Sequence, residues 1–221
     1  MVRPSSGMRE LVLSSALRLF AQHGYRGTSL QDIASDAGCA KASLLYHFGT
    51  KEAILLELLV PVAKDAVALD ARLAGLDGVE AAVAAVTGFA ELALRYRREL
   101  KLLFDNGPEV AELPDVGVDG IEGVGDRLLD AVAGRSTAPS DRVTANLVLG
   151  GIAMVGAGDL AYDEATMREA MIGGALRALG RDHAHDHAAN RDHDHEPDRA
   201  RELDHDREPD RAREQAPDDE G

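Results

Sequence analysis

The residues best suited to recognising another molecule are gathered in one segment, residues 28–48, TSLQDIASDAGCAKASLLYHF. Its pattern predicts a helix, a tight turn at Gly38 and a second helix that projects outward. Small or hydrogen-bonding side chains and one cation occupy the outer positions of this second helix: Lys41, Ala42, Ser43, Tyr46 and His47. A helix of this size fits the major groove of DNA, where such groups reach base edges and phosphates. The same geometry also occurs as plain packing, and Tyr46 could pack against the first helix instead.

The start of the first helix in this segment offers further contacts. Thr28 or Ser29 opens it, and Thr28 with Gln31 has the spacing of a capping box. Unpaired N–H groups and the positive end of the helix dipole would attract a phosphate at Thr28 and Ser29, although Thr28 could also be only a cap. Lys51, at the start of the next helix, is predicted to bind the other side of the groove.

Helical periodicity dominates the elements that must position these residues. Apolar residues recur at helical spacing from Met8 to Phe20, and the run stops at Gly24. Further helices are expected near residues 51–73, 79–104, 121–133, 141–158 and 163–180, and no segment alternates like a strand. The fold class is therefore all-α, with about nine helices. We expect three parts: a helix-turn-helix domain at 6–52, a helical domain at 53–180 and a tail at 181–221.

The charge of the chain is divided unequally among these parts. The net charge is −15. Residues 1–52 contain six basic and four acidic residues and carry a net +2, whereas residues 53–180 carry −9 and residues 181–221 carry −8. Contacts with phosphates are therefore expected only from the N-terminal part, and the acidic remainder should face away from DNA.

Several classes of protein are disfavoured. Cys39 is the single cysteine, so no internal disulfide or cysteine-rich zinc site is expected. The longest uncharged run, 143–158, is too short to cross a bilayer, which needs about 20 residues, and no secretion signal is seen. We expect a cytoplasmic protein without a membrane partner. Because no catalytic or nucleotide-binding motif is present, we expect neither an enzyme nor a cofactor.

The stretch from Arg9 to about Leu56 resembles the TetR family of regulators. The matching features are Ala16–Leu17, Leu19–Phe20, Gly24–Tyr25, Thr28–Ser29, Ile33–Ala34, Ala37–Gly38, Lys41, Ser43–Leu44, His47–Phe48 and Lys51–Glu52. The resemblance implies a homodimer that places two recognition helices in successive major grooves of a palindromic operator. It also implies that the remaining helices bind a small-molecule effector and dimerise, and that the protein acts as a repressor more often than as an activator.

Two positions depart from the family pattern. Leu45 stands where the family usually has a tyrosine that touches a phosphate. Tyr46 cannot simply replace it, because one residue along a helix is a rotation of about 100°. Cys39 stands where the family usually has an aliphatic residue, and we interpret it as packing rather than as a redox switch.

The resemblance assigns roles to the C-terminal helices. In the family the last two helices pair with their copies, and small residues would permit close crossing there, although packing within one chain is the alternative. The predicted dimer interface comprises Gly150, Gly151, Ala153, Met154, Ala157, Gly173 and Gly174. An effector pocket is expected between the middle helices, for an apolar or weakly polar ligand. Its candidate lining residues, any of which could be ordinary core, are Phe89, Leu92, Tyr96, Leu103, Phe104 and Met154.

The tail after Arg181 has a composition of its own. It is rich in Asp, His, Arg, Glu and Pro, repeats EPDRARE at 196–202 and 208–214, and is expected to be disordered. No metal site is predicted. The alternative is a metal-responsive or metal-buffering protein that uses loosely held imidazoles, which suit Zn²⁺ or Ni²⁺. The histidines concerned are His183, His185, His187, His193 and His195.

Overall fold

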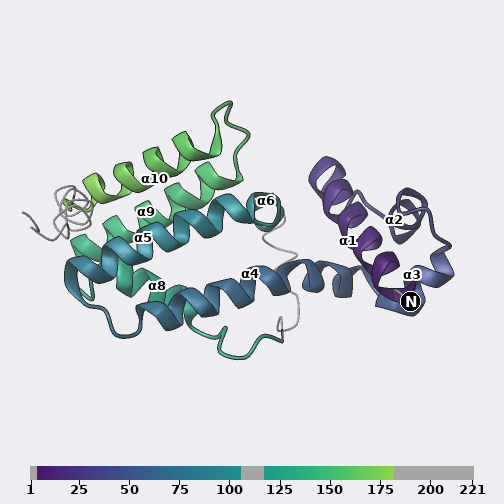
Figure 1. Ribbon diagram of the computed structural model, residues 1–221, viewed down its shortest axis with the longest axis horizontal. Coiled ribbons are helices and arrows are strands. Elements are labelled where there is room, and N and C mark those ends of the chain that lie inside the picture. Colours follow the sequence, from purple (N-terminus) through teal and green to yellow (C-terminus); the bar gives the residue numbers. More distant parts are fainter. Residues whose placement is uncertain (1–3, 106–116, 182–221) are drawn as a thin grey trace, which may run out of the picture.

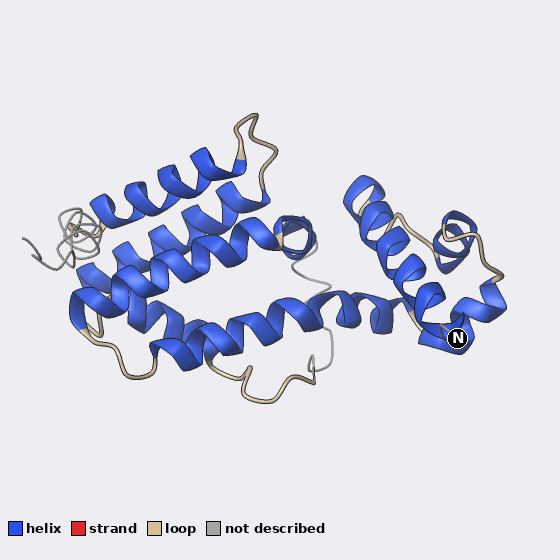
Figure 2. Ribbon diagram, in the orientation of Figure 1, coloured by secondary structure: helices blue, strands red, loops and turns tan. Residues whose placement is uncertain are grey.

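The computed structural model describes residues 4–105 and 117–181. Nine helices and no strand occur in these two ranges, which confirms the predicted all-α fold class (Figure 2). Within the described residues, no helix combines the length and the hydropathy that a membrane span requires. The histidine-rich tail lies outside the described residues.

The N-terminal helices surround a small core of their own. They are α1 (Pro4–His23), α2 (Leu30–Asp36) and α3 (Lys41–Phe48). Val12, Ala16 and Phe20 of α1 present the predicted apolar stripe to buried residues of α2 and α3. This core also includes residues of the next helix, α4 (Lys51–Leu73), as far along as Leu59.

Helix α4 takes part in both cores of the molecule. Its first half supplies Ile54 and Leu55 to the N-terminal core, and its second half supplies Leu69 and Leu73 to the C-terminal one. Figure 1 shows this helix running from the group formed by α1–α3 into the larger helical bundle. A movement of α4 would therefore change the packing of both cores.

The C-terminal bundle consists of α5 (Gly78–Arg95), α6 (Arg97–Asp105), α8 (Val124–Val132), α9 (Pro139–Ala157) and α10 (Glu164–Ala178), together with the end of α4. Glycines allow close crossings inside it. A Cβ atom on Gly88 of α5 would lie 2.4 Å from Leu69 of α4, and one on Gly156 of α9 would lie 2.8 Å from Ala93 of α5. The segment at 79–104, for which the sequence allows one helix or two, is two helices, which meet at Tyr96.

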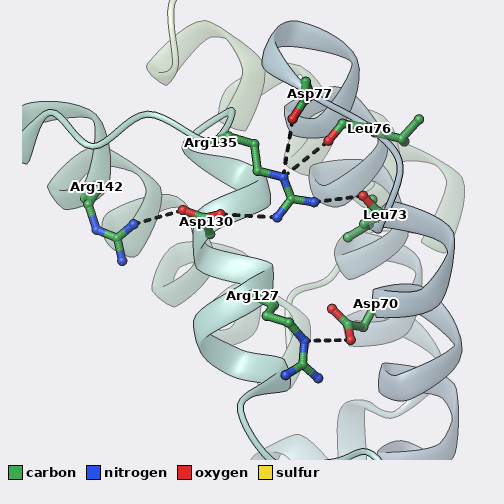
Figure 3. Close-up of polar contacts among 8 residues, drawn as sticks. All are labelled: Asp70, Leu73, Leu76, Asp77, Arg127, Asp130, Arg135 and Arg142. Carbon is green, nitrogen blue, oxygen red and sulfur yellow. Dashed lines mark hydrogen bonds and ion pairs between the residues drawn. The ribbon is translucent and has the colours of Figure 1, made fainter.

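Arginine side chains fasten α8 and the loop after it to α4 (Figure 3). Arg135 donates hydrogen bonds to the backbone oxygen of Leu73 (2.8 Å), the last residue of α4, to that of Leu76 (3.2 Å) just after the helix, and to Asp130 (3.2 Å). Arg135 adopts a φ of 62°, in the left-handed region that favours glycine. Arg135 thus adopts an unfavourable backbone conformation, and the hydrogen bonds of its guanidinium offset that cost.

Substitution of Arg135 separates these two effects. We expect Arg135→Ala to lower the free energy of unfolding by about 2 kcal/mol, because two helix-end carbonyls lose a charged donor. Arg135→Gly should lose about 1 kcal/mol less, because glycine relieves the backbone strain. Urea denaturation at a fixed protein concentration measures both values. Equal losses in the two variants would contradict the strain argument.

Candidate functional site

Helices α2 and α3 are held together by buried apolar residues on their inner faces. Ile33 and Ala34 of α2 and Leu44 of α3 are fully buried, and Phe48 closes the end of α3. Gly38 lies in the turn between the helices with a φ of 67°, which only glycine adopts at little cost. Cys39 is partly buried and packs against the same core, as the packing interpretation expects.

The outer face of α3 is open to solvent. Lys41 and Ala42 are exposed, Tyr46 is 86% exposed, and Ser43 and His47 are half-buried. Tyr46 therefore does not pack against α1; its ring instead meets the His47 ring edge-on at 5.4 Å. Helix α3 begins at Lys41, and its N-cap Ala40 offers no side-chain acceptor. The N–H groups of Lys41 and Ala42 can therefore donate to an external acceptor, whereas that of Ser43 donates to the backbone oxygen of Ala40. This face can donate hydrogen bonds, and Lys41 gives it one positive charge.

The start of α2 carries a cap that differs from the predicted one. Ser29 is its N-cap: Ser29 Oγ accepts a hydrogen bond from Asp32 N, and Asp32 Oδ2 accepts one from Ser29 N (2.8 Å). The capping box is thus Ser29–Asp32 and not Thr28–Gln31. Hydrogen bonds from Ser29 lower the pKa of Asp32, so a carboxylate already stands where a phosphate was expected.

The predicted phosphate contacts of Thr28 and Lys51 disagree with the positions of these two side chains. Thr28 is 2% exposed, and its hydroxyl donates to the backbone oxygens of Gly24 (2.9 Å) and Leu19. The Lys51 ammonium donates to the backbone oxygens of Tyr25 (2.8 Å) and Thr28 (3.0 Å) and lies 4.1 Å from the centre of the Tyr25 ring. Both side chains therefore fix the loop before α2 rather than reach outward.

Other contacts with this loop and with α3 were not identified from the sequence. Glu52 accepts a hydrogen bond from the Tyr25 hydroxyl (3.1 Å), and its own backbone N–H is the main cause of its lowered pKa. Arg9 of α1 binds Glu57 of α4, donates to the backbone oxygen of His47 and lies over the Phe48 ring. These residues are distant in sequence and no periodic pattern connects them.

Acidic side chains around α3 are largely occupied by these internal contacts. Arg9 pairs with Glu57, and Arg18 of α1 pairs with Asp36 of α2. Lys41, in contrast, forms no ion pair with any residue in the described ranges. The positive charge of Lys41 therefore remains available at the start of the exposed helix.

A cavity of about 260 Å³ lies among α4, α5, α6 and α8. Of the predicted pocket residues, Phe89 and Leu92 line it. Tyr96 and Leu103 do not: the Tyr96 hydroxyl donates to Asp65 (2.8 Å), and Leu103 packs between the two cores. Burial, followed by the contact with Asp65, raises the pKa of Tyr96.

The two remaining predicted pocket residues point elsewhere. Phe104 is 48% exposed and Met154 is 62% exposed, and neither lines the cavity. Met154 belongs instead to an exposed apolar face of α9, so its assignment to the dimer interface agrees better with its position than its assignment to the pocket.

This exposed apolar face is shared by α9 and α10. Val143, Leu147 and Met154 are 60–71% exposed on α9. Leu147 also lines an apolar groove of about 340 Å³, together with Ala170 and Gly174 of α10. We call these residues, with Gly151, the α9/α10 face.

The small residues predicted for the dimer interface divide into two groups. A Cβ atom on Gly150 or Gly151 would meet no other atom within 4 Å, so these two positions are open, and Gly173 and Gly174 are half-buried. Ala153 is 7% exposed and is therefore covered by its own chain. Ala157 is half-buried against the C-terminal core. Ala153 therefore offers little surface to a second copy, and the interface formed by the other residues stays a prediction.

Metal binding finds no candidate in the described helices. Among residues 4–105 and 117–181, no group of three or more His, Cys, Asp or Glu side chains is placed to hold an ion. His183, His185, His187, His193 and His195 lie outside those ranges, so the metal-binding alternative is not addressed by them.

Comparison with known proteins finds a family match in the N-terminal part of the chain. Residues 12–58 match the family model described as bacterial regulatory proteins, tetR family. The chain is 36% identical over 100 residues to the HTH-type transcriptional regulator RutR of Escherichia coli K12, covering 44% of each protein. It is 45% identical over 47 residues to IcaR of Staphylococcus aureus Newman, named as a negative transcriptional regulator, covering 21% of this chain and 25% of IcaR. The chain thus spans less than half the length of these curated relatives.

Solved structures share the fold over most of the chain. PfmR of Thermus thermophilus, a TetR family regulator, superposes with a TM-score of 0.58 at 23% identity and covers 76% of this chain and 98% of its own. AibR, solved with isovaleryl coenzyme A and operator DNA, gives a TM-score of 0.55 at 22% identity, with 76% and 97% covered. At these identities the likeness establishes the fold.

Proposed function

Since the chain belongs to the TetR family of bacterial regulatory proteins, we propose that it is a transcriptional repressor that binds a palindromic operator as a homodimer and leaves it when a small molecule binds. The observation that carries this proposal is the exposed face of α3, where Lys41, Ala42 and Tyr46 project from a rigid helix-turn-helix. The name of IcaR supports repression rather than activation.

The α9/α10 face supports the dimer. Exposed apolar side chains that gather on two neighbouring helices mark a surface that another protein covers. A twofold axis through this face would make the contact self-complementary and give the dimer two copies of α3. Recognition helices of such dimers reach half-sites one DNA turn, about 34 Å, apart. A palindromic operator matches that symmetry.

The cavity supports control by a small molecule, because two of the helices around it also contribute residues to the N-terminal core. Leu100 of α6 lines the cavity, while Leu102 of the same helix is 2% exposed within the N-terminal core. Helix α4 lines the cavity too and joins both cores. A ligand that favours another position of α4 and α6 would change the spacing of the two α3 helices and so weaken operator binding. AibR, which was solved with both an acyl-CoA and operator DNA, supports such a pairing of ligands.

The test is a fluorescence-anisotropy titration of the full chain with the DNA upstream of its own gene, at about 50 and about 200 mM salt. If the dimer neutralises about six phosphates, its affinity should fall about 1,000-fold between these two salt concentrations. A scrambled duplex of the same length is the control and should bind more weakly. Equal binding to both duplexes, or binding that salt leaves unchanged, would contradict the proposal.

A further inference from the structure

One carboxylate interrupts an otherwise apolar cavity. The residues that line the 260 Å³ cavity are apolar side chains or glycine, among them Phe89, Leu92 and Leu128, with the single exception of Asp70. Asp70 lies on α4 and its side chain is 21% exposed. An ionised group in such surroundings requires partners, because burial of an unpaired charge is costly.

Arg127 of α8 is that partner. Its Nε donates to Asp70 Oδ2 at 2.8 Å (Figure 3). Its two terminal nitrogens donate to the backbone oxygens of Glu122 (2.9 Å) and Gly120 (3.3 Å), so the guanidinium is fixed by the loop before α8. The pair is electrically neutral. Asp70 Oδ1 receives no hydrogen bond from the residues that the structure describes, so one oxygen of this cavity-lining carboxylate can accept a hydrogen bond.

We propose that the effector is a compact, uncharged and mostly apolar molecule that donates one hydroxyl hydrogen bond to Asp70, as a simple phenol or alcohol would. This inference rests on the proposed function of the cavity as the effector site. The hydroxyl satisfies the remaining acceptor oxygen, and the apolar body replaces contacts that the cavity walls lack. Because Asp70 lies on α4, the ligand acts on the helix that joins both cores.

Charged and large ligands fit less well. An anion would be repelled by the Asp70 carboxylate, while the Arg127 guanidinium already donates to three oxygens. A cation would gain little net attraction, because Arg127 already balances the charge of Asp70. The cavity is also smaller than the roughly 300–1,000 Å³ of sites for drug-sized ligands, so a coenzyme A ester, the ligand in the AibR structure, exceeds it.

Calorimetric titration of the full chain, without DNA, tests the inference with three matched probes: 4-propylphenol, propylbenzene and 4-propylbenzoate. We expect 4-propylphenol to bind about tenfold more tightly than propylbenzene, through one hydrogen bond to a charged acceptor, and 4-propylbenzoate to bind least. Failure of all three probes to bind, tightest binding of the benzoate, or equal binding of phenol and propylbenzene would overturn the inference.

Three variants locate the binding site. Asp70→Ala should remove the tenfold preference for phenol while leaving propylbenzene binding unchanged. Asp65→Ala is the matched control: Asp65 is also an ion-paired carboxylate on α4, but it pairs with Arg95 and does not line this cavity, so the preference should persist. Ala66→Phe should fill the cavity and abolish binding of both probes. Unchanged phenol binding by Asp70→Ala or by Ala66→Phe, each with an unaltered circular dichroism spectrum, would contradict the assignment.

The operator titration keeps the two proposals separate. If wild type binds operator DNA but no probe, the class of effector is wrong and the repressor proposal stands. If it binds 4-propylphenol in an Asp70-dependent way but no operator, the site stands and the repressor proposal is wrong.

Discussion

Replacing Lys41 and Tyr46 with alanine together is expected to weaken operator binding about 1,000-fold. Each side chain occurs twice in a dimer, so the double variant removes four contacts. A phosphate or base contact contributes about 1 kcal/mol or more, and four such contacts amount to about three factors of ten. Both side chains are exposed and Lys41 has no internal ion pair within the described residues, so their loss should leave the fold intact. Fluorescence anisotropy at one salt concentration measures the effect.

The matched control is Lys64→Ala. Lys64 is an exposed lysine on the part of α4 beyond the N-terminal core, so its removal changes the net charge without touching α3. Its affinity for the operator should stay within about threefold of wild type. Tyr46→Phe separates the hydroxyl from the ring, because only the hydroxyl can donate a hydrogen bond. If the double variant and Lys64→Ala bind equally well, α3 is not the recognition helix.

The fold could be predicted because apolar periodicity reports which face of each helix is buried. The stripe from Val12 to Phe20 packs as predicted, and the helix expected at 51–73 is α4. The predicted outer positions of α3 are likewise exposed or half-buried, since Leu44 and Phe48 take the inner face. Where one face of a helix must be buried and the other exposed to solvent, the spacing of apolar residues shows which face is which.

Hydrogen-bond partners could not be predicted in the same way. Thr28–Gln31 and Ser29–Asp32 have identical spacing, and both pairs suit a capping box. The structure forms the second pair because the Thr28 hydroxyl turns inward to the end of α1. Lys51 lies at a helix start, where a phosphate contact was plausible, yet its ammonium reaches two carbonyls of a loop more than 20 residues earlier in the sequence. These choices depend on tertiary packing, which no local pattern records.

Glycine shows the same limit in the C-terminal domain. Gly151 and Gly156 lie on one helix, and the sequence alone does not show which of them another helix of the same chain covers. A Cβ on Gly156 would collide with Ala93 of α5, whereas a Cβ on Gly151 would meet nothing within 4 Å. The first glycine allows two helices of one chain to approach, and the second leaves a surface open. Only the positions of the neighbouring helices distinguish them.

The open surface leads to the second large effect, in the variant Leu147→Asp. Leu147 is 71% exposed and borders the apolar groove between α9 and α10. In the single chain a charge there costs little, because water solvates it. Across a twofold interface the same change places two carboxylates in an apolar contact, where like charges repel and neither is paired. We therefore expect the dimer to dissociate at least about 100 times more readily, as measured by sedimentation equilibrium.

Loss of the dimer should also lower the affinity for the operator. This second effect distinguishes a dimer interface from an exposed apolar patch that contacts no second copy. A monomer holds one α3 and one half-site, so it loses the second set of contacts that the linked copy supplies at high effective concentration. Val79→Asp is the matched control, because Val79 is a 49% exposed apolar residue on α5 that neither belongs to the α9/α10 face nor lines its groove. It should leave both the dimer and operator binding unchanged. If Leu147→Asp remains dimeric while its thermal unfolding is unaltered, the two copies meet through another surface, and the spacing of their α3 helices must be set by contacts other than α9 and α10.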